Sequence, residues 1–114
     1  MKLLVVFLAL LMNLPVQASA RSELLLRQFV DSSEADLVRA VIGASGETLS
    51  WVNERLKQDG KPPFYCQPKN LALANAQYAS ILQKYVDENP NTGTITWQAY
   101  PAVLLNALIH TFPC

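Results

Sequence analysis

Residues 37–58 read LVRAVIGASGETLSWVNERLKQ, and this stretch decides the fold class. Apolar or small side chains recur along it at steps of three and four, at Leu37, Val41, Ala44, Thr48, Val52 and Leu56. This spacing places them on one side of an α-helix, because one turn takes 3.6 residues. The stretch therefore predicts one long amphipathic helix that ends near Gln58.

Two glycines interrupt the pattern, at Gly43 and Gly46. They are compatible with the end of one helix and the start of another, since glycine weakens a helix. They are also compatible with one continuous helix, in which the glycines form a patch without side chains that a neighbouring helix can approach closely. The uninterrupted apolar stripe favours the continuous helix.

The segments on either side of this helix have distinct signals. Ser22–Val30 carries several apolar residues and suits a short helix, and Asp31–Ser33 supplies N-cap chemistry for the long one. Downstream, residues 59–63 read DGKPP and must break the helix. The prolines lack a backbone N–H and force the preceding residue into an extended conformation.

Two further helices are predicted beyond this break. One is expected to begin with Asn70 as its cap and to run to about Asn89, before Pro90. The last is expected over Trp97–His110, with Pro101 tolerated only in its first turn. No strand pattern is longer than four residues, so the sequence predicts an all-α fold, a small bundle of about four helices.

The chain has two cysteines, Cys66 and Cys114, and the second is its last residue. A disulfide between them would tie down a terminus that otherwise frays, provided that the compartment is oxidising. In the chain-entropy model, closing this loop stabilises the fold by roughly 4 kcal/mol. We therefore predict a single Cys66–Cys114 bridge that staples the bundle.

The N-terminus indicates such a compartment. Met1 and Lys2 form a short positive region, Leu3–Leu14 is apolar, and Ala18-Ser19-Ala20 offers a cleavage site for signal peptidase. A transmembrane anchor is the alternative, but about 12 apolar residues fall short of the roughly 20 that a helix needs to cross a bilayer. Residues 1–20 are thus predicted to be a signal peptide cleaved after Ala20. Residues 21–114 are predicted to form one exported domain without a membrane segment.

Charge and chemistry exclude several classes of function. Nine basic and nine acidic residues balance one another, which argues against nucleic acid or an anionic membrane as the partner. The only histidine is His110, and no serine has the context of an activated nucleophile. One histidine and two distant cysteines do not make a metal site. We therefore expect a protein that is not an enzyme and that needs no cofactor or metal.

Most carboxylates have a cation three or four residues away. Glu54 and Lys57, Arg55 and Asp59, and Lys84 and Glu88 have the spacing of helical surface pairs. Glu47 has no such partner, and we expect it in solvent. Among the aromatic residues, Phe64 and Trp97 follow turn signals and are the candidate anchors for a protein partner.

Three motifs lie at or between the cysteines: Tyr65-Cys66-Gln67-Pro68, Tyr85-Val86-Asp87-Glu88-Asn89-Pro90 and the ending Ala107-Leu108-Ile109-His110-Thr111-Phe112-Pro113-Cys114. In their order and spacing they resemble the Rap/Tai family of immunity proteins. Many members carry another cysteine in the segment equivalent to residues 38–46, which this chain lacks. These motifs are mostly cysteines, prolines and core positions, so they describe the scaffold more than its binding surface.

The resemblance implies a function. Members of this family are periplasmic proteins that protect bacteria against peptidoglycan amidase effectors delivered by type VI secretion. It thus implies a secreted amidase as the protein partner, which is occluded without turnover, and it is compatible with a homodimer. The turn-rich segments 58–64 and 88–97 are then the candidate protrusions. Their candidate contact residues are Asp59, Lys61, Phe64, Asn91 and Trp97.

Two other functions stay open at this point. An acid-stress chaperone of the periplasm has a similar size, helical content and disulfide. One histidine and few clustered carboxylates leave little to titrate together, which weighs against it. A non-catalytic interaction domain of the cell envelope, without any toxin to neutralise, is the other alternative.

Overall fold

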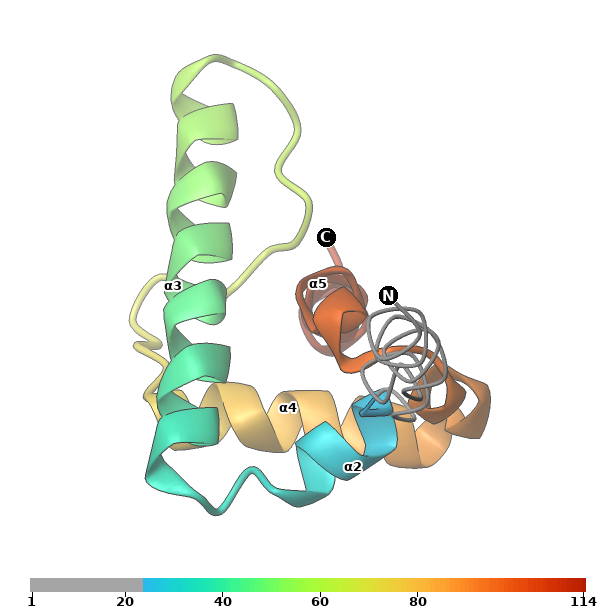
Figure 1. Cartoon of the computed structure of the whole chain (residues 1–114). Coiled ribbons are helices and arrows are strands. Elements are labelled where there is room, and N and C mark those ends of the chain that lie inside the picture. Colours follow the sequence, from blue (N-terminus) through green and yellow to red (C-terminus); the bar gives the residue numbers. More distant parts are fainter. Residues whose placement is uncertain (1–23) are drawn as a thin grey trace, which may run out of the picture.

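The computed structural model describes residues 24–114, so the predicted signal peptide lies outside the described residues. The described part is all-α, as predicted (Figure 1). Its α-helices are α2 (Leu26–Asp31), α3 (Asp36–Gln58), α4 (Asn75–Glu88) and α5 (Tyr100–Thr111). Two short 3-10 helices, η2 (Pro90–Thr94) and η3 (Trp97–Ala99), connect α4 to α5. None of these helices combines the length and the hydrophobicity needed to cross a membrane.

Helix α3 is continuous through both glycines, which confirms the second interpretation of Gly43 and Gly46. A Cβ atom at Gly43 would overlap the side chain of Asn75, and one at Gly46 would overlap the ring of Tyr78. Both neighbours belong to α4, so the glycines allow α4 to pass directly against the backbone of α3. The crossing of the two helices is visible in Figure 1, where α4 runs across the lower end of α3.

The buried side of α3 differs from the predicted stripe. The buried residues of the helix are Ile42, Gly43, Gly46 and Asn53. Leu37 and Val52 of the predicted stripe are 75% and 43% exposed. The prediction of the buried side was wrong because glycine adds nothing to a hydrophobic pattern, whereas close backbone approach decides which side meets α4.

Helix α4 begins four residues later than predicted, because its N-cap residue is Ala74 instead of Asn70. The segment before α4 forms a turn instead of a helix, in which the Leu71 N–H donates to the Pro68 carbonyl at 3.0 Å. The helix start is fixed by Gln77, whose Oε1 accepts the N–H of Ala74 at 2.7 Å. In a capping box, a glutamine at the third helical position accepts the backbone N–H of the N-cap residue in this way. The helix therefore begins after Ala74 and not after Asn70, although asparagine is the better N-cap residue.

The core lies between α2, α3, α4 and α5, and the chain that returns from α3 adds Tyr65 to it. Its fully buried large side chains are Leu26, Val30, Ile42, Tyr65, Tyr78, Leu82, Val86, Leu104 and Leu108. Helix α2 begins at Leu26 because Leu24 and Leu25 are extended and pair with the chain at Thr96. The Leu26 N–H donates to Ile95 at 2.8 Å, and the Trp97 N–H donates to Leu24 at 3.0 Å. This pairing joins the first described residues to the α4–α5 connection.

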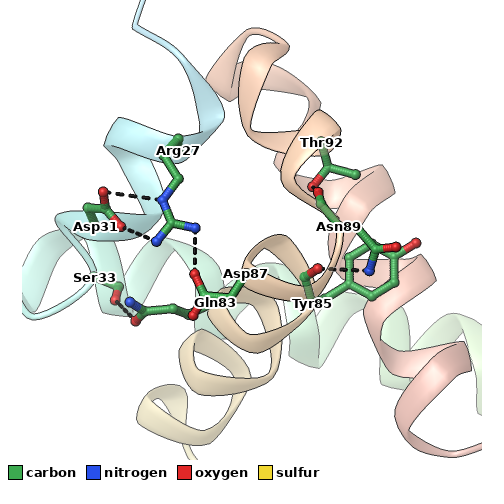
Figure 2. A network of polar contacts seen from close by, with 8 residues as sticks. All are labelled: Arg27, Asp31, Ser33, Gln83, Tyr85, Asp87, Asn89 and Thr92. Carbon is green, nitrogen blue, oxygen red and sulfur yellow. Dashed lines mark hydrogen bonds and ion pairs between the residues drawn. The ribbon is translucent and has the colours of Figure 1, made fainter.

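A polar network also joins α2 to α4 (Figure 2). The Arg27 guanidinium bridges Asp31, at 3.0 Å, and Asp87 of α4. Ser33 reaches Gln83 at 3.4 Å, and the Asn89 side chain donates to the Tyr85 carbonyl at 2.9 Å. Because the Arg27 pairs are half exposed, they contribute modestly to stability.

Helix α5 ends beside the disulfide. Pro101 occupies its first turn, as predicted. Cys114 is bonded to Cys66, with their Cα atoms 4.9 Å apart, and the Cys66 N–H donates to the Phe112 carbonyl at 2.8 Å. The predicted bridge is therefore present, and it fixes the chain that returns from α3 to the end of α5.

Candidate functional site

The C-terminal part of α3 and the returning chain extend beyond the packed helices. We call residues 51–66 the arm, and α2, residues 36–50, α4, η2, η3 and α5 the body. In Figure 1 the arm rises from the body as the end of α3 and a descending loop beside it. The arm contains three of the five predicted contact residues: Asp59, Lys61 and Phe64.

The turn at the tip of the arm is a regular helix end. The Lys61 N–H donates to the Leu56 carbonyl at 2.8 Å, and the Gly60 N–H donates to Lys57 at 3.1 Å. This pair of bonds is a Schellman motif, which requires a left-handed residue after the C-cap. Gly60 has that conformation, with φ of 71°. The turn is therefore defined by backbone hydrogen bonds that reverse the chain at a fixed point.

Asn53 attaches the loop to α3. It is 3% exposed, and both the oxygen and the nitrogen of its side-chain amide form hydrogen bonds. Its Oδ1 accepts the N–H of Phe64 at 2.7 Å and that of Tyr65 at 3.4 Å, while its Nδ2 donates to the Tyr65 carbonyl at 2.8 Å. One buried amide thus satisfies three backbone groups that would otherwise be unpaired in the interior.

Tyr65 anchors the loop against the body. Its side chain is almost fully buried, although its hydroxyl makes no hydrogen bond of normal geometry among the described residues. Burial is the main cause that raises the pKa of Tyr65. The neighbouring Ser50 hydroxyl lowers this pKa and so offsets part of the rise. Asn53, Tyr65 and the disulfide at Cys66 therefore fix three consecutive positions, residues 64 to 66.

The side chains at the tip point to solvent. Asp59 pairs with Arg55 at 3.2 Å, and Glu54 pairs with Lys57 at 2.9 Å, which confirms both predicted surface pairs. Lys61 is exposed and forms no ion pair among the described residues, while Phe64 is 47% exposed. The loop of the arm therefore presents the Phe64 ring, the Lys61 cation and the paired Asp59 carboxylate on a backbone that is held by hydrogen bonds.

The other two predicted contact residues lie in the body. Asn91 is exposed within η2, and Trp97 is half-buried within η3. The Trp97 ring packs 5.2 Å from that of Phe29 and stacks on Tyr100 at 6.2 Å. Trp97 thus contributes to the edge of the core, and the structure does not bring segment 88–97 together with the arm.

Sequence reasoning did not identify Asn53 or Tyr65 as determinants of the site. A signal was present: Asn53 follows Ile42 by 11 residues, which is three helical turns and therefore the same side of the helix. A polar side chain on the buried side of a helix needs hydrogen-bond partners. The extended segment after the two prolines offers them, because its backbone groups are not paired within a helix.

Two open hollows lie on the described surface near charged side chains. One, of about 480 Å³, adjoins the arm: it lies between α3 and residues 65–71, and its lining includes Asn53, Lys57 and Lys69. The other, of about 420 Å³, lies between α4 and α5 near His110, whose Nε2 is 3.7 Å from a Glu88 oxygen. Both hollows are shallow and open. Within residues 24–114, no three potential metal ligands are grouped together.

Comparison of the chain with protein-family models, with curated proteins and with solved structures found no match. The function is therefore argued from the residues of this chain.

Proposed function

We propose that this chain is a periplasmic immunity protein that binds a type VI secreted peptidoglycan amidase and occludes its active-site groove. The proposal combines the sequence pattern of residues 65–114 with the arm. The single observation that carries it is the loop of the arm, which projects from the body and is fixed at both ends.

A fixed loop suits occlusion for a physical reason. Binding costs free energy when a flexible segment must be ordered, and preorganisation lowers that cost. The Schellman turn fixes the start of the loop, and Asn53 with the disulfide fixes its end. The exposed residues between these points enter a groove without a large loss of conformational entropy.

Occlusion also requires no chemistry from this chain. The arm offers a hydrophobic ring at Phe64 and charges at Asp59 and Lys61, which are contacts of a kind that interfaces use. An inhibitor of this type acts at a ratio of one to one, and the amidase supplies all catalytic groups.

The proposal is tested by protection of cells. The proposal predicts that the neighbouring gene encodes the amidase. This amidase is directed to the periplasm of a bacterium that lacks both proteins, with or without the full chain. Cells without the chain should lyse, and cells with it should survive. A chain lacking residues 1–20 is the matched control, because it is expected to stay in the cytoplasm and give no protection.

An assay with purified proteins gives the mechanism. Residues 21–114 should reduce amidase activity in proportion to the amount added, with complete inhibition near one equivalent. Amidase activity that persists in a tenfold excess of the chain would refute the proposal. Light scattering of the isolated chain would determine whether it forms the homodimer that the resemblance allows.

A further inference from the structure

Residues 61–64, Lys-Pro-Pro-Phe, form an unusual surface segment within the arm. Lys61 and Pro62 each precede a proline, so both are restricted to extended or polyproline II conformations. The ring of each proline also fixes its own φ near that of polyproline II. The segment is therefore extended for a reason that is local to its sequence.

The ends of this segment are attached to α3. The Lys61 N–H donates to Leu56 at 2.8 Å, and the Phe64 N–H donates to Asn53 Oδ1 at 2.7 Å. Between these bonds the prolines have no N–H, and no backbone hydrogen bond among the described residues uses the carbonyls of residues 61–63. Those carbonyls are free to accept bonds from a partner.

The missing N–H groups exclude one mode of recognition. A segment that adds to the edge of a partner's sheet needs alternating N–H donors, and two successive prolines remove them. Polyproline segments are instead bound in grooves lined by aromatic side chains, whose flat rings pack against the proline rings. Their preformed shape again lowers the entropy lost on binding.

We propose that Lys61–Phe64 is a polyproline-type ligand that docks into an aromatic-lined groove of the protein partner. Phe64, which is 47% exposed, fills a pocket next to that groove. Lys61, which has no ion pair among the described residues, faces a carboxylate of the partner. This inference rests on the proposed function for the identity of the partner.

The test is the affinity of the mature chain for the amidase that the proposed function expects in the neighbouring gene, measured by calorimetry. Phe64→Ala should weaken binding at least 30-fold, because it empties the pocket. Phe64→Leu should have an intermediate effect. The double variant P62A/P63A keeps Phe64 and should weaken binding about fivefold, because the segment must then be ordered on binding.

Trp51→Ala is the matched control. Trp51 is 73% exposed on the same helix, but it lies just over half a turn from Asn53 and hence on the side away from the loop. It should change affinity less than twofold. Circular dichroism is expected to show native helix in every variant, since the altered side chains are exposed or partly exposed.

The outcomes separate the two proposals. A wild-type chain that binds, together with Phe64→Ala and P62A/P63A variants of unchanged affinity, would overturn this inference alone. A loss of affinity in Phe64→Ala but none in P62A/P63A would overturn the polyproline mode. A wild-type chain that does not bind the amidase would overturn both the inference and the proposed function.

Discussion

The body and the arm are stabilised by different interactions. In the body, α4 passes against the bare backbone of α3 at Gly43 and Gly46, and side chains from all four α-helices fill the core. In the arm, Asn53, the buried ring of Tyr65 and the Cys66–Cys114 bond attach the loop. The body thus depends on packing over a large area, and the arm depends on a few specific contacts.

This difference explains how a small domain can present an extended segment. A loop held by many apolar contacts would have to bury the side chains that a partner should meet. A loop held through its backbone leaves its side chains available, as Lys61 and Phe64 are here. Variants that affect one region and spare the other should therefore separate stability from binding.

The largest effect is expected from the disulfide. Replacing both cysteines, as in C66S/C114S, should lower the free energy of unfolding by about 3 to 4 kcal/mol, because the closed loop of 48 residues no longer restricts the unfolded chain. Urea denaturation measures this change. Adding a reductant should destabilise the wild type and leave the double variant unaffected, and equal stability of the two proteins would contradict the account.

The next effect tests the packing of the body. Gly46→Ala should destabilise the fold by about 2 kcal/mol, because its new methyl group overlaps the buried ring of Tyr78. Gly60→Ala is the control in the arm. No atom lies near its Cβ position, so only its positive φ opposes the change, at a cost of about 1 kcal/mol. If Gly46→Ala were as stable as the wild type, α4 could not approach α3 as described.

Asn53→Ala should cost about 2 kcal/mol, because it leaves backbone groups of Phe64 and Tyr65 unpaired near the interior. Thr48→Ala is the matched control on the same helix. Thr48 is exposed and donates only to Ala44 of its own helix, so its loss should cost less than about 0.5 kcal/mol. Thermal unfolding of both variants would check this, and equal melting temperatures would refute a special role for Asn53.

The smallest effect concerns pH. Burial raises the pKa of Tyr78 to about 12, with further contributions from Glu47 and Tyr65. The unfolded chain loses this proton near pH 10, before the folded chain does. The neutral phenol therefore makes its full contribution to stability below pH 10, and this contribution is lost as the pH rises toward 12. At pH 11 the free energy of unfolding should be lower by about 1 kcal/mol. The decline between pH 9 and 11 should be shallower in Tyr78→Phe, and identical slopes would contradict the burial of Tyr78.

Much of the fold could be predicted from the sequence, because most of its signals are local. The long helix, the break at residues 59–63 and the tolerance of Pro101 follow from periodicity and proline chemistry. The disulfide was predicted from the presence of only two cysteines and from the predicted export signal. The surface pairs of Lys57, Arg55 and Lys84 followed from helical spacing.

The features that could not be predicted from the sequence depend on tertiary contacts. The buried side of α3 is set by the approach of α4 to glycines, which a hydrophobic pattern does not register. The start of α4 depends on Gln77 and on the path of residues 67–74. The role of Asn53 requires a backbone segment 11 residues away in the chain to return to the same helix.

Hydrogen exchange at the amide of Phe64 tests the central claim most directly. If Asn53 attaches the loop, this amide should be protected in the wild type. In Asn53→Ala it should exchange at least tenfold faster, while the amides of Leu82 and Val86 in α4 keep more of their protection. A Phe64 amide that exchanges freely in the wild type, or at the same rate in both proteins, would show that Asn53 does not hold the loop of the arm.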